Sequence, residues 1–334
     1  MPDLSQSDLR WPHRLAVVLV CATFPLIWVG GLVTTTKSGM AVPDWPSTYG
    51  YNMFLYPWET WVFGPFDLFI EHGHRLLASL VGMLCMAFVG LALWRRDRTL
   101  IVLGSVALGV VLFQGILGGV RVVADKTTVA RIHGCVGPLC LAWLVYVECY
   151  TSRRWRNATP IDSRRGNSYV RLSIGFTVIT FLQILLGSML RHIPLGMTPE
   201  TFRAAVIFHV ITAFLVAAVS VALLWLASRD PHRCGTIWRA SLMAVLLVLG
   251  QIGLGITAWI VKYGWPTFLP GGNLYPNLLV QWESWLQSFV VTAHVAVGSL
   301  ILATAVLLMV YSVKRYPLLS KSPQASAPTH EVMA

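Results

Sequence analysis

Four histidines lie inside long segments that are otherwise apolar: His74, His133, His209 and His294. A neutral imidazole is a common metal ligand and proton carrier, and an ionisable residue inside an apolar span is costly unless it serves a function. One such histidine could simply hydrogen-bond to a neighbouring helix. Because the four recur at one depth, one in each of four segments, we interpret them as ligands.

The residues around these histidines narrow the choice of metal. Four imidazoles could hold zinc or copper, but thiolate and carboxylate ligands nearby are sparse, and none of the six cysteines forms a C-x-x-C pair. Imidazoles paired across facing helices suit the two axial positions of a haem iron. Glycines nearby would let a flat ring lie close to the backbone: Gly118, Gly119, Gly137, Gly187, Gly255 and Gly298.

The pairs expected from the chain order, His74/His133 and His209/His294, differ in their surroundings. The second pair has only apolar or hydroxyl neighbours, which suits electron transfer. The first pair has Glu71 three residues before His74, on the same helical face. Arg75 follows His74 directly and is a further candidate for cofactor binding. A carboxylate there could accept protons or stabilise positive charge on a substrate carbon. Alternatively, Glu71 only forms a salt bridge with Arg75 at the start of the helix.

Three further basic residues are candidates for roles near these pairs. Arg121 and Arg191 stand at the expected outer rim, where they could bind haem propionates through charge-assisted hydrogen bonds. The alternative is that they extend from helix ends to the membrane surface. His72 points about 200° away from His74 around the helix, so we expect it at the edge of a loop.

The elements that position these residues are membrane spans. Hydrophobic residues make up 56% of the chain and charged residues 12%, against roughly 25% charged in soluble domains. The mean hydropathy is +0.66. The net charge of +11 is explained by basic loops that meet anionic membrane lipid, and no nucleic acid is needed.

The apolar runs predict eight transmembrane helices of roughly 20 residues each, at 14–36, 71–94, 99–121, 128–150, 169–191, 203–228, 238–262 and 286–312. Basic residues following the even-numbered spans outnumber those on the other side by fifteen to seven. This bias predicts cytoplasmic termini, with the long loops 37–70 and 263–285 outside. The aromatic first loop is expected either to cover the N-terminal site or to anchor at the membrane surface.

An internal repeat divides the chain. The pattern Q-x-x-L-G recurs at 114–118, 183–187 and 251–255, and H-x-x-V-G-x-L at 133–139 and 294–300. We predict an all-α integral membrane protein with two four-helix bundles related by a pseudo-two-fold axis. The N-terminal half is 1–150, with the substrate haem site. The C-terminal half is 151–316, with an electron-carrying haem, and 317–334 is a disordered cytoplasmic tail.

These residues resemble the heme A synthases. The resemblance is carried by E-x-x-H-R at Glu71, His74 and Arg75, by GGLVTTTKSG at 30–39 with Trp45, and by the single histidines of spans 4, 6 and 8. It covers nearly the whole chain. The first loop departs from the family because it lacks the cysteine pair that many bacterial members carry, and because Met40-Ala-Val-Pro-Asp-Trp45 replaces the family's usual segment.

The resemblance implies an oxidoreductase that oxidises a methyl group of haem O to the formyl group of haem A, for assembly of terminal oxidases. His74 and His133 would ligate the haem O substrate and haem A product, His209 and His294 a haem b, and Glu71 would act near the reacting methyl. The resemblance also implies that the protein is located in the cell membrane. It further implies a partner that donates haem O, such as haem O synthase, and contact with the oxidase assembly machinery. The resemblance identifies no electron acceptor, and it is compatible with a homo-oligomer.

Two other functions compete with this prediction. A di-haem membrane cytochrome would pass electrons without modifying haem, and would have no evident need for Glu71. A membrane transporter would use the histidines as a proton relay and would bind no haem.

Overall fold

The computed structural model describes residues 9–124, 127–161, 163–193, 196–232, 234–265 and 284–317. The described residues are helical, with these elements: α1 (Arg10–Thr35), η2 (Ser38–Met40), α2 (Trp58–Val62), α3 (Phe66–Trp94), α4 (Arg98–Ala124), α5 (Thr127–Thr151), α6 (Arg153–Arg156), α7 (Arg164–Arg191), α8 (Pro199–Ser228), α9 (Gly235–Tyr263) and α10 (Trp285–Arg315). Eight of these helices are long and apolar enough to cross a membrane. The predicted all-α architecture with eight spans is confirmed.

Several helices begin before the predicted apolar run because polar residues cap them. Ser163, Thr198 and Ser284 precede α7, α8 and α10, and the side chain of each accepts a hydrogen bond from a main-chain N–H of the first turn. α3 follows Pro65 and begins at Phe66, five residues earlier than the hydropathy indicates. The predicted tail and most of the predicted loop 263–285 lie outside the described residues.

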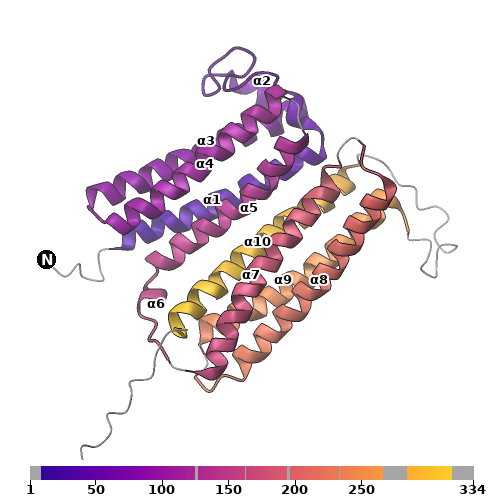
Figure 1. The fold of residues 1–334 in the computed structure, drawn as a ribbon. Helices are drawn as coiled ribbons and strands as arrows, with labels where there is room; N and C mark the ends of the chain where they lie inside the picture. Colours follow the sequence, from indigo (N-terminus) through magenta and orange to yellow (C-terminus); the bar gives the residue numbers. More distant parts are fainter. Residues whose placement is uncertain are drawn as a thin grey trace, which may run out of the picture.

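The long helices form two groups of four that lie side by side (Figure 1). The first group, called here the N-terminal half, contains α1, α3, α4 and α5, and the C-terminal half contains α7, α8, α9 and α10. One apolar core, around Phe88 and Leu100, lies within the N-terminal half, and a second, around Phe176 and Leu223, fills the C-terminal half and extends to Leu141 of α5. This arrangement is consistent with the predicted pseudo-two-fold relation, while the exact domain boundaries stay predictions.

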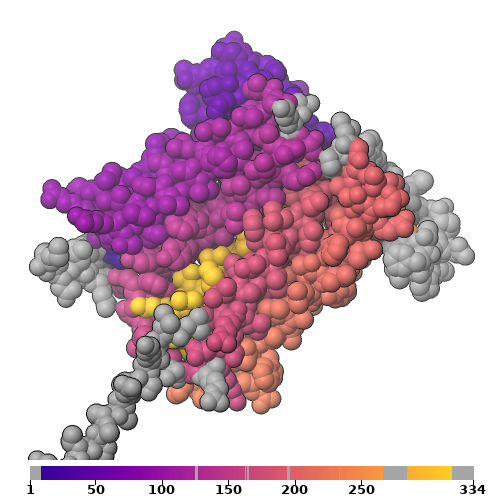
Figure 2. All heavy atoms as spheres, viewed as in Figure 1, coloured from indigo at the N-terminus to yellow at the C-terminus, as the bar shows by residue number. Residues whose placement is uncertain are grey.

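The fourth helix of each half forms the centre of the molecule. Half of the apolar window of α5 and of α10 is buried inside the protein, against 11–28% for the other six spans. α5 packs on α10, and α10 also packs on α1 of the other half. In the space-filling view α10 is visible only as a narrow band between the two halves (Figure 2).

The two ends of the bundle differ. One end, called the loop end, carries the segment between α1 and α3, including η2 and α2 (Figure 1). The opposite end carries the start of α1 and the end of α10, and is called the terminal end. The histidines of interest lie in the loop-end halves of their helices, because α3, α5, α8 and α10 all begin there.

Small and hydroxyl residues close the contact between α1 and α10. A methyl group added at Gly31 would lie 2.8 Å from Cγ2 of Thr292. The hydroxyls of Thr35 and Thr292 are 3.0 Å apart and hydrogen-bonded, and Ser288 Oγ donates to the carbonyl oxygen of Thr35 at 3.3 Å. Close backbone approach with hydroxyl bonding is a usual way to join helices in a membrane.

The change Gly31→Val should separate α1 from α10 and lower thermal stability, because overpacking a close contact costs about 1–3 kcal/mol. The measurement is the unfolding midpoint of the detergent-purified protein. Gly109→Val is the matched control, since nothing lies within 4 Å of a methyl group added at Gly109. Equal midpoints for the two variants would contradict the expected role of Gly31.

Candidate functional site

The four predicted ligand histidines share one repeated setting. Each lies against a glycine of the neighbouring helix, so that a methyl group added to the glycine would meet Cε1 of the ring: Gly30 with His74 (2.8 Å), Gly118 with His133 (3.5 Å), Gly187 with His209 (3.2 Å) and Gly255 with His294 (3.1 Å). The sequence pattern identified three of these glycines. It missed Gly30, because Leu26 takes the place of the glutamine on which the pattern depends.

A glutamine on the adjacent helix fixes three of the four histidine-bearing helices. Its side-chain Nε2 donates to the main-chain carbonyl oxygen of the histidine: Gln114 to His133 (3.1 Å), Gln183 to His209 (2.9 Å) and Gln251 to His294 (2.9 Å). Gly137 and Gly298 make room for these amides, at 3.3 and 3.2 Å from an added methyl group. The Q-x-x-L-G repeat therefore has a physical role, which is to hold each histidine helix at a fixed depth.

The imidazole rings retain ligand capacity. Nδ1 of His74, His133, His209 and His294 is buried and has no hydrogen-bond partner among the described residues. Four unpartnered ring nitrogens in equivalent positions are compatible with the predicted role as metal ligands, which stays a prediction. The described residues contain no group of three or more His, Cys, Asp or Glu that could hold a metal ion. A metal with two protein ligands, such as haem iron, fits this donor set.

The spacing of the C-terminal pair supports this interpretation. The ring centroids of His209 and His294 are 6.4 Å apart, with the rings inclined at 64°. Two imidazoles bound to one metal through nitrogen bonds of about 2 Å have centroids separated by roughly 6 Å. The N-terminal pair, His74 and His133, also lies close enough for the two rings to interact electrostatically.

Glu71 and Arg75 form a buried ion pair that holds the first loop. Glu71 is 3% exposed, and its Oε1 is 2.7 Å from Arg75 Nη2. Its other oxygen, Oε2, accepts the main-chain N–H of Val42 at 2.9 Å. The salt bridge that the alternative interpretation required is therefore present. The catalytic role of Glu71 stays a prediction.

Arg75 is bonded to the backbone of the first loop. Nη1 donates to the carbonyl oxygens of Asp44 (2.7 Å) and Ser47 (3.0 Å), and Nη2 to that of Val42 (2.9 Å). A guanidinium is planar and rigid and has several N–H donors, so one arginine can bind several oxygen acceptors at the same time and hold them in fixed positions. The predicted contact between Arg75 and a cofactor stays untested beside this structural role.

His72 is a further anchor of the loop, and its predicted position at a loop edge was wrong. The residue is 1% exposed within α3, and its Nδ1 is 3.1 Å from the hydroxyl of Thr48. Its ring packs against Tyr56 and Trp61, with centroids 5.4 and 5.0 Å away. The loop that covers it comes from sequence 24 residues earlier, so helical spacing alone could not reveal the burial.

The first loop also places Trp45, which is 40% exposed, against the surface of the N-terminal half. The indole lies directly on Gly119 of α4, next to Gly118, which contacts the His133 ring.

Asp44 shapes the turn that follows by accepting hydrogen bonds from the main-chain N–H groups of Tyr49 and Gly50, each at 2.8 Å. Burial opposes ionisation, but hydrogen bonds from Ser47, Gly50 and Tyr49 outweigh it and lower the pKa of Asp44. The loop is thus an ordered cover beside His133, while its role as a lid stays a prediction.

Arg121 and Arg191 both lie at the loop end, as predicted. Arg191 Nη2 donates to the carbonyl oxygen of Gly31 at 2.8 Å, which links α7 of one half to α1 of the other. The guanidinium of Arg121 lies against Gly39 and interacts electrostatically with His74 and His133. Their contacts with haem propionates stay predictions.

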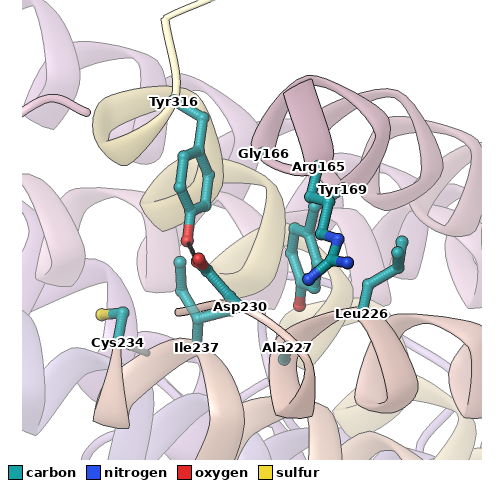
Figure 3. Close-up of a pocket in the computed structure, with 9 residues that line it drawn as sticks. All are labelled: Arg165, Gly166, Tyr169, Leu226, Ala227, Asp230, Cys234, Ile237 and Tyr316. Carbon is teal, nitrogen blue, oxygen red and sulfur yellow. Dashed lines mark hydrogen bonds between the residues drawn. The ribbon is translucent and has the colours of Figure 1, made fainter. Parts of the chain in front are cut away.

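A small pocket at the terminal end is separate from these residues (Figure 3). Arg165, Tyr169 and Cys234 are among its lining, and the Tyr316 hydroxyl donates to the carboxylate of Asp230 across it. Burial and the Asp230 carboxylate raise the pKa of Tyr316. Since the pocket contains none of the predicted ligands, it is not the candidate site.

The change Arg75→Lys should loosen the loop, because an ammonium group cannot reproduce a fork that bonds three carbonyl oxygens and a carboxylate. Hydrogen bonds to charged groups contribute roughly 1.5–3 kcal/mol, so amide exchange of residues 42–48 should accelerate by about tenfold or more. Hydrogen exchange with mass spectrometry measures this. Arg203→Lys, an exposed arginine of α8 at the same end, is the control. Unchanged exchange in the Arg75 variant would contradict the clamp.

Known proteins share this sequence over much of its length. Residues 13–206 match the family model described as cytochrome oxidase assembly protein, a segment that includes Glu71, His74, His133, Arg121 and Arg191. The chain is 25% identical over 266 residues to a heme A synthase of Shouchella clausii, covering 73% of this chain and 85% of the relative. It is 26% identical over 255 residues to a heme A synthase of Symbiobacterium thermophilum, covering 68% and 80%. The chain therefore belongs to the family of cytochrome oxidase assembly proteins, and the resemblance to the heme A synthases is confirmed.

Proposed function

We propose that the protein is a heme A synthase that oxidises a methyl group of haem O to the formyl group of haem A. The N-terminal half would bind the substrate haem through His74 and His133, and the C-terminal half a haem b through His209 and His294. The family membership and the orphaned ring nitrogens of these histidines support this assignment. We also propose that it acts in the cell membrane with the loop end outside and both termini in the cytoplasm.

The observation that carries the proposal is the asymmetry at Glu71. The position three residues before the histidine is Ala130 for His133, Val206 for His209 and Val291 for His294. Only the helix of His74 has a carboxylate there, and it is buried. The arrangement of a histidine against a glycine occurs four times, but a carboxylate accompanies it only at His74. This asymmetry supports a reaction at the His74 site only.

Glu71, Arg75 and the first loop would then have separate roles in the reaction. A bound haem iron supplies one-electron redox chemistry when it is present. Glu71 would accept protons released as the methyl carbon is oxidised, or stabilise positive charge developing on that carbon. Arg75 and the Val42 N–H hold the two carboxylate oxygens in place. The first loop, with Trp45 on Gly119, would exclude water from the N-terminal site.

Partners follow from this proposal. A haem O donor such as haem O synthase would deliver the substrate, and the oxidase assembly machinery would receive the product.

One observation favours the di-haem cytochrome as a second candidate. Both oxygens of Glu71 are bonded to the loop and to Arg75, so the residue also has a purely structural use. Expressing the protein with a source of haem O and extracting its haems separates the two functions. Haem A in the extract supports the synthase, and both sites occupied without haem A supports the cytochrome.

The changes His209→Ala and His294→Ala should each abolish the bis-imidazole haem signal of the C-terminal half, because each removes an axial ligand. A reduced-minus-oxidised spectrum of the purified protein measures this. His232→Ala, a histidine at the terminal end, is the control and should keep the signal. A wild-type protein without any bis-imidazole signal would favour the transporter over both haem functions.

The change Glu71→Gln should keep haem bound and lower conversion of haem O by about 10²-fold or more, as expected for loss of a general base. Extracted haem A relative to haem O gives the conversion, and the haem spectrum reports binding. Glu59→Gln removes an exposed carboxylate of α2 and should convert normally. Normal conversion by the Glu71 variant would contradict the catalytic role.

A further inference from the structure

Two equivalent contacts join the halves, and they differ in charge. When Gly30 is matched with Gly187, and His133 with His294, the contact of α1 with α10 corresponds to that of α7 with α5. Thr34 and Thr35 then correspond to Arg191 and His192, and Thr292 corresponds to Arg131. One contact is thus built from neutral hydroxyl residues and the other from basic ones.

One pair of equivalent positions is hydrogen-bonded in both contacts, Thr35 with Thr292 and His192 with Arg131, whereas the second bond of each contact joins different positions. In the neutral contact, Thr292 bonds to the Thr35 side chain and Ser288 to the Thr35 carbonyl. In the basic contact, which we name the α5–α7 junction, Arg131 Nη2 donates to the His192 carbonyl oxygen at 2.8 Å. Ser188 Oγ donates to the Arg131 carbonyl oxygen at 3.5 Å. Hydroxyl groups alone join α1 to α10, so the repeated contact between the halves can form without cations.

Positive charge accumulates at this junction. Arg131 and Arg191 donate to main-chain carbonyl oxygens, and Nε of each is buried without a hydrogen-bond partner among the described residues. Burial, followed by the charges of Arg191, Arg121, Arg131 and Lys262, lowers the pKa of His192 to about 3. Like charges held together favour the binding of an anion. The contact between α5 and α7 is also less extensive than the contact between α1 and α10.

The junction is adjacent to the N-terminal pair of histidines. Arg191 bonds to Gly31, whose neighbour Gly30 contacts the His74 ring. A methyl group added at Gly134, beside His133, would lie 3.9 Å from Nε2 of His192. Arg121 interacts electrostatically with both His74 and His133, whereas no described cation is among the electrostatic neighbours of His209 or His294.

We infer that the α5–α7 junction binds the carboxylate groups of the haem held by His74 and His133, with Arg131, Arg191 and His192 as its contacts. This inference rests on the proposed function. Its new content is that Arg191 and His192, which belong to the C-terminal half, complete the substrate site of the N-terminal half.

Anchored carboxylates would orient the substrate. Two axial imidazoles leave a flat ring free to turn about the axis through the iron and its two nitrogen ligands. Charge-assisted bonds to one rim of the ring stop that rotation and determine which edge faces Glu71. The α5–α7 junction therefore selects the methyl group that reacts.

The experiment uses the full chain carrying His209→Ala and His294→Ala, so that only the N-terminal site remains. Hemin and hemin dimethyl ester, which lacks free carboxylates, are titrated into the detergent-purified protein and followed by absorbance. Adding Arg191→Gln or Arg131→Gln should weaken hemin binding by about tenfold or more and leave ester binding unchanged. Arg203→Gln is the matched control at the same end of the bundle and should change neither.

The outcomes separate this inference from the proposed function. If the parent binds no hemin, the haem function fails and the inference fails with it. If the parent binds hemin and the arginine variants bind it equally well, or lose the ester in the same proportion, the inference alone is overturned. Equal binding is also the result expected if a lipid phosphate occupies the junction. Folding is checked by keeping His209 and His294 in a second copy of each arginine variant, which should retain the haem signal of the C-terminal half.

Discussion

The structure depends on the close approach of an imidazole ring to the backbone of the neighbouring helix. A polar ring between apolar helices needs a fixed position, and glycine provides it by letting the ring lie on the main chain. Gly30, Gly118, Gly187 and Gly255 do this for the four histidines. Where a glutamine bonds the histidine carbonyl as well, the depth of the helix is also fixed. Helix pairing and ligand position are therefore determined by the same residues.

The functional differences arise as departures from this repeated unit. Glu71 replaces the apolar residue found at the other three positions, and it is tied to the first loop through Val42 and Arg75. Arginine and histidine replace threonine at one of the two contacts between halves. Both departures lie beside the N-terminal pair of histidines. The C-terminal pair of histidines has neither departure beside it, and we proposed above that the C-terminal half only carries electrons.

Much of this was predictable from the sequence, because bilayer spans have a length and polarity that composition reveals directly. The eight spans, the histidines and the glutamine repeat were found in this way. The glutamine pattern does not reveal Gly30, because its helix lacks the glutamine. Hydropathy predicts the starts of α7, α8 and α10 too late, because the residues that cap these helices are polar. The burial of His72 and the bonds of Arg75 join segments that no helical period relates. Such contacts depend on the path of a loop, which local pattern does not specify.

Arg75 bonds to the main-chain oxygens of Val42, Asp44 and Ser47, and to none of their side chains. Every residue has a main-chain carbonyl group. The hydrogen bonds of Arg75 therefore depend on the backbone conformation of the loop and not on the identity of the side chains at these positions. Substitutions that preserve the path can accumulate there while the cover stays closed. The outward side chains of the first loop can therefore differ without disturbing the carboxylate of Glu71 beneath it.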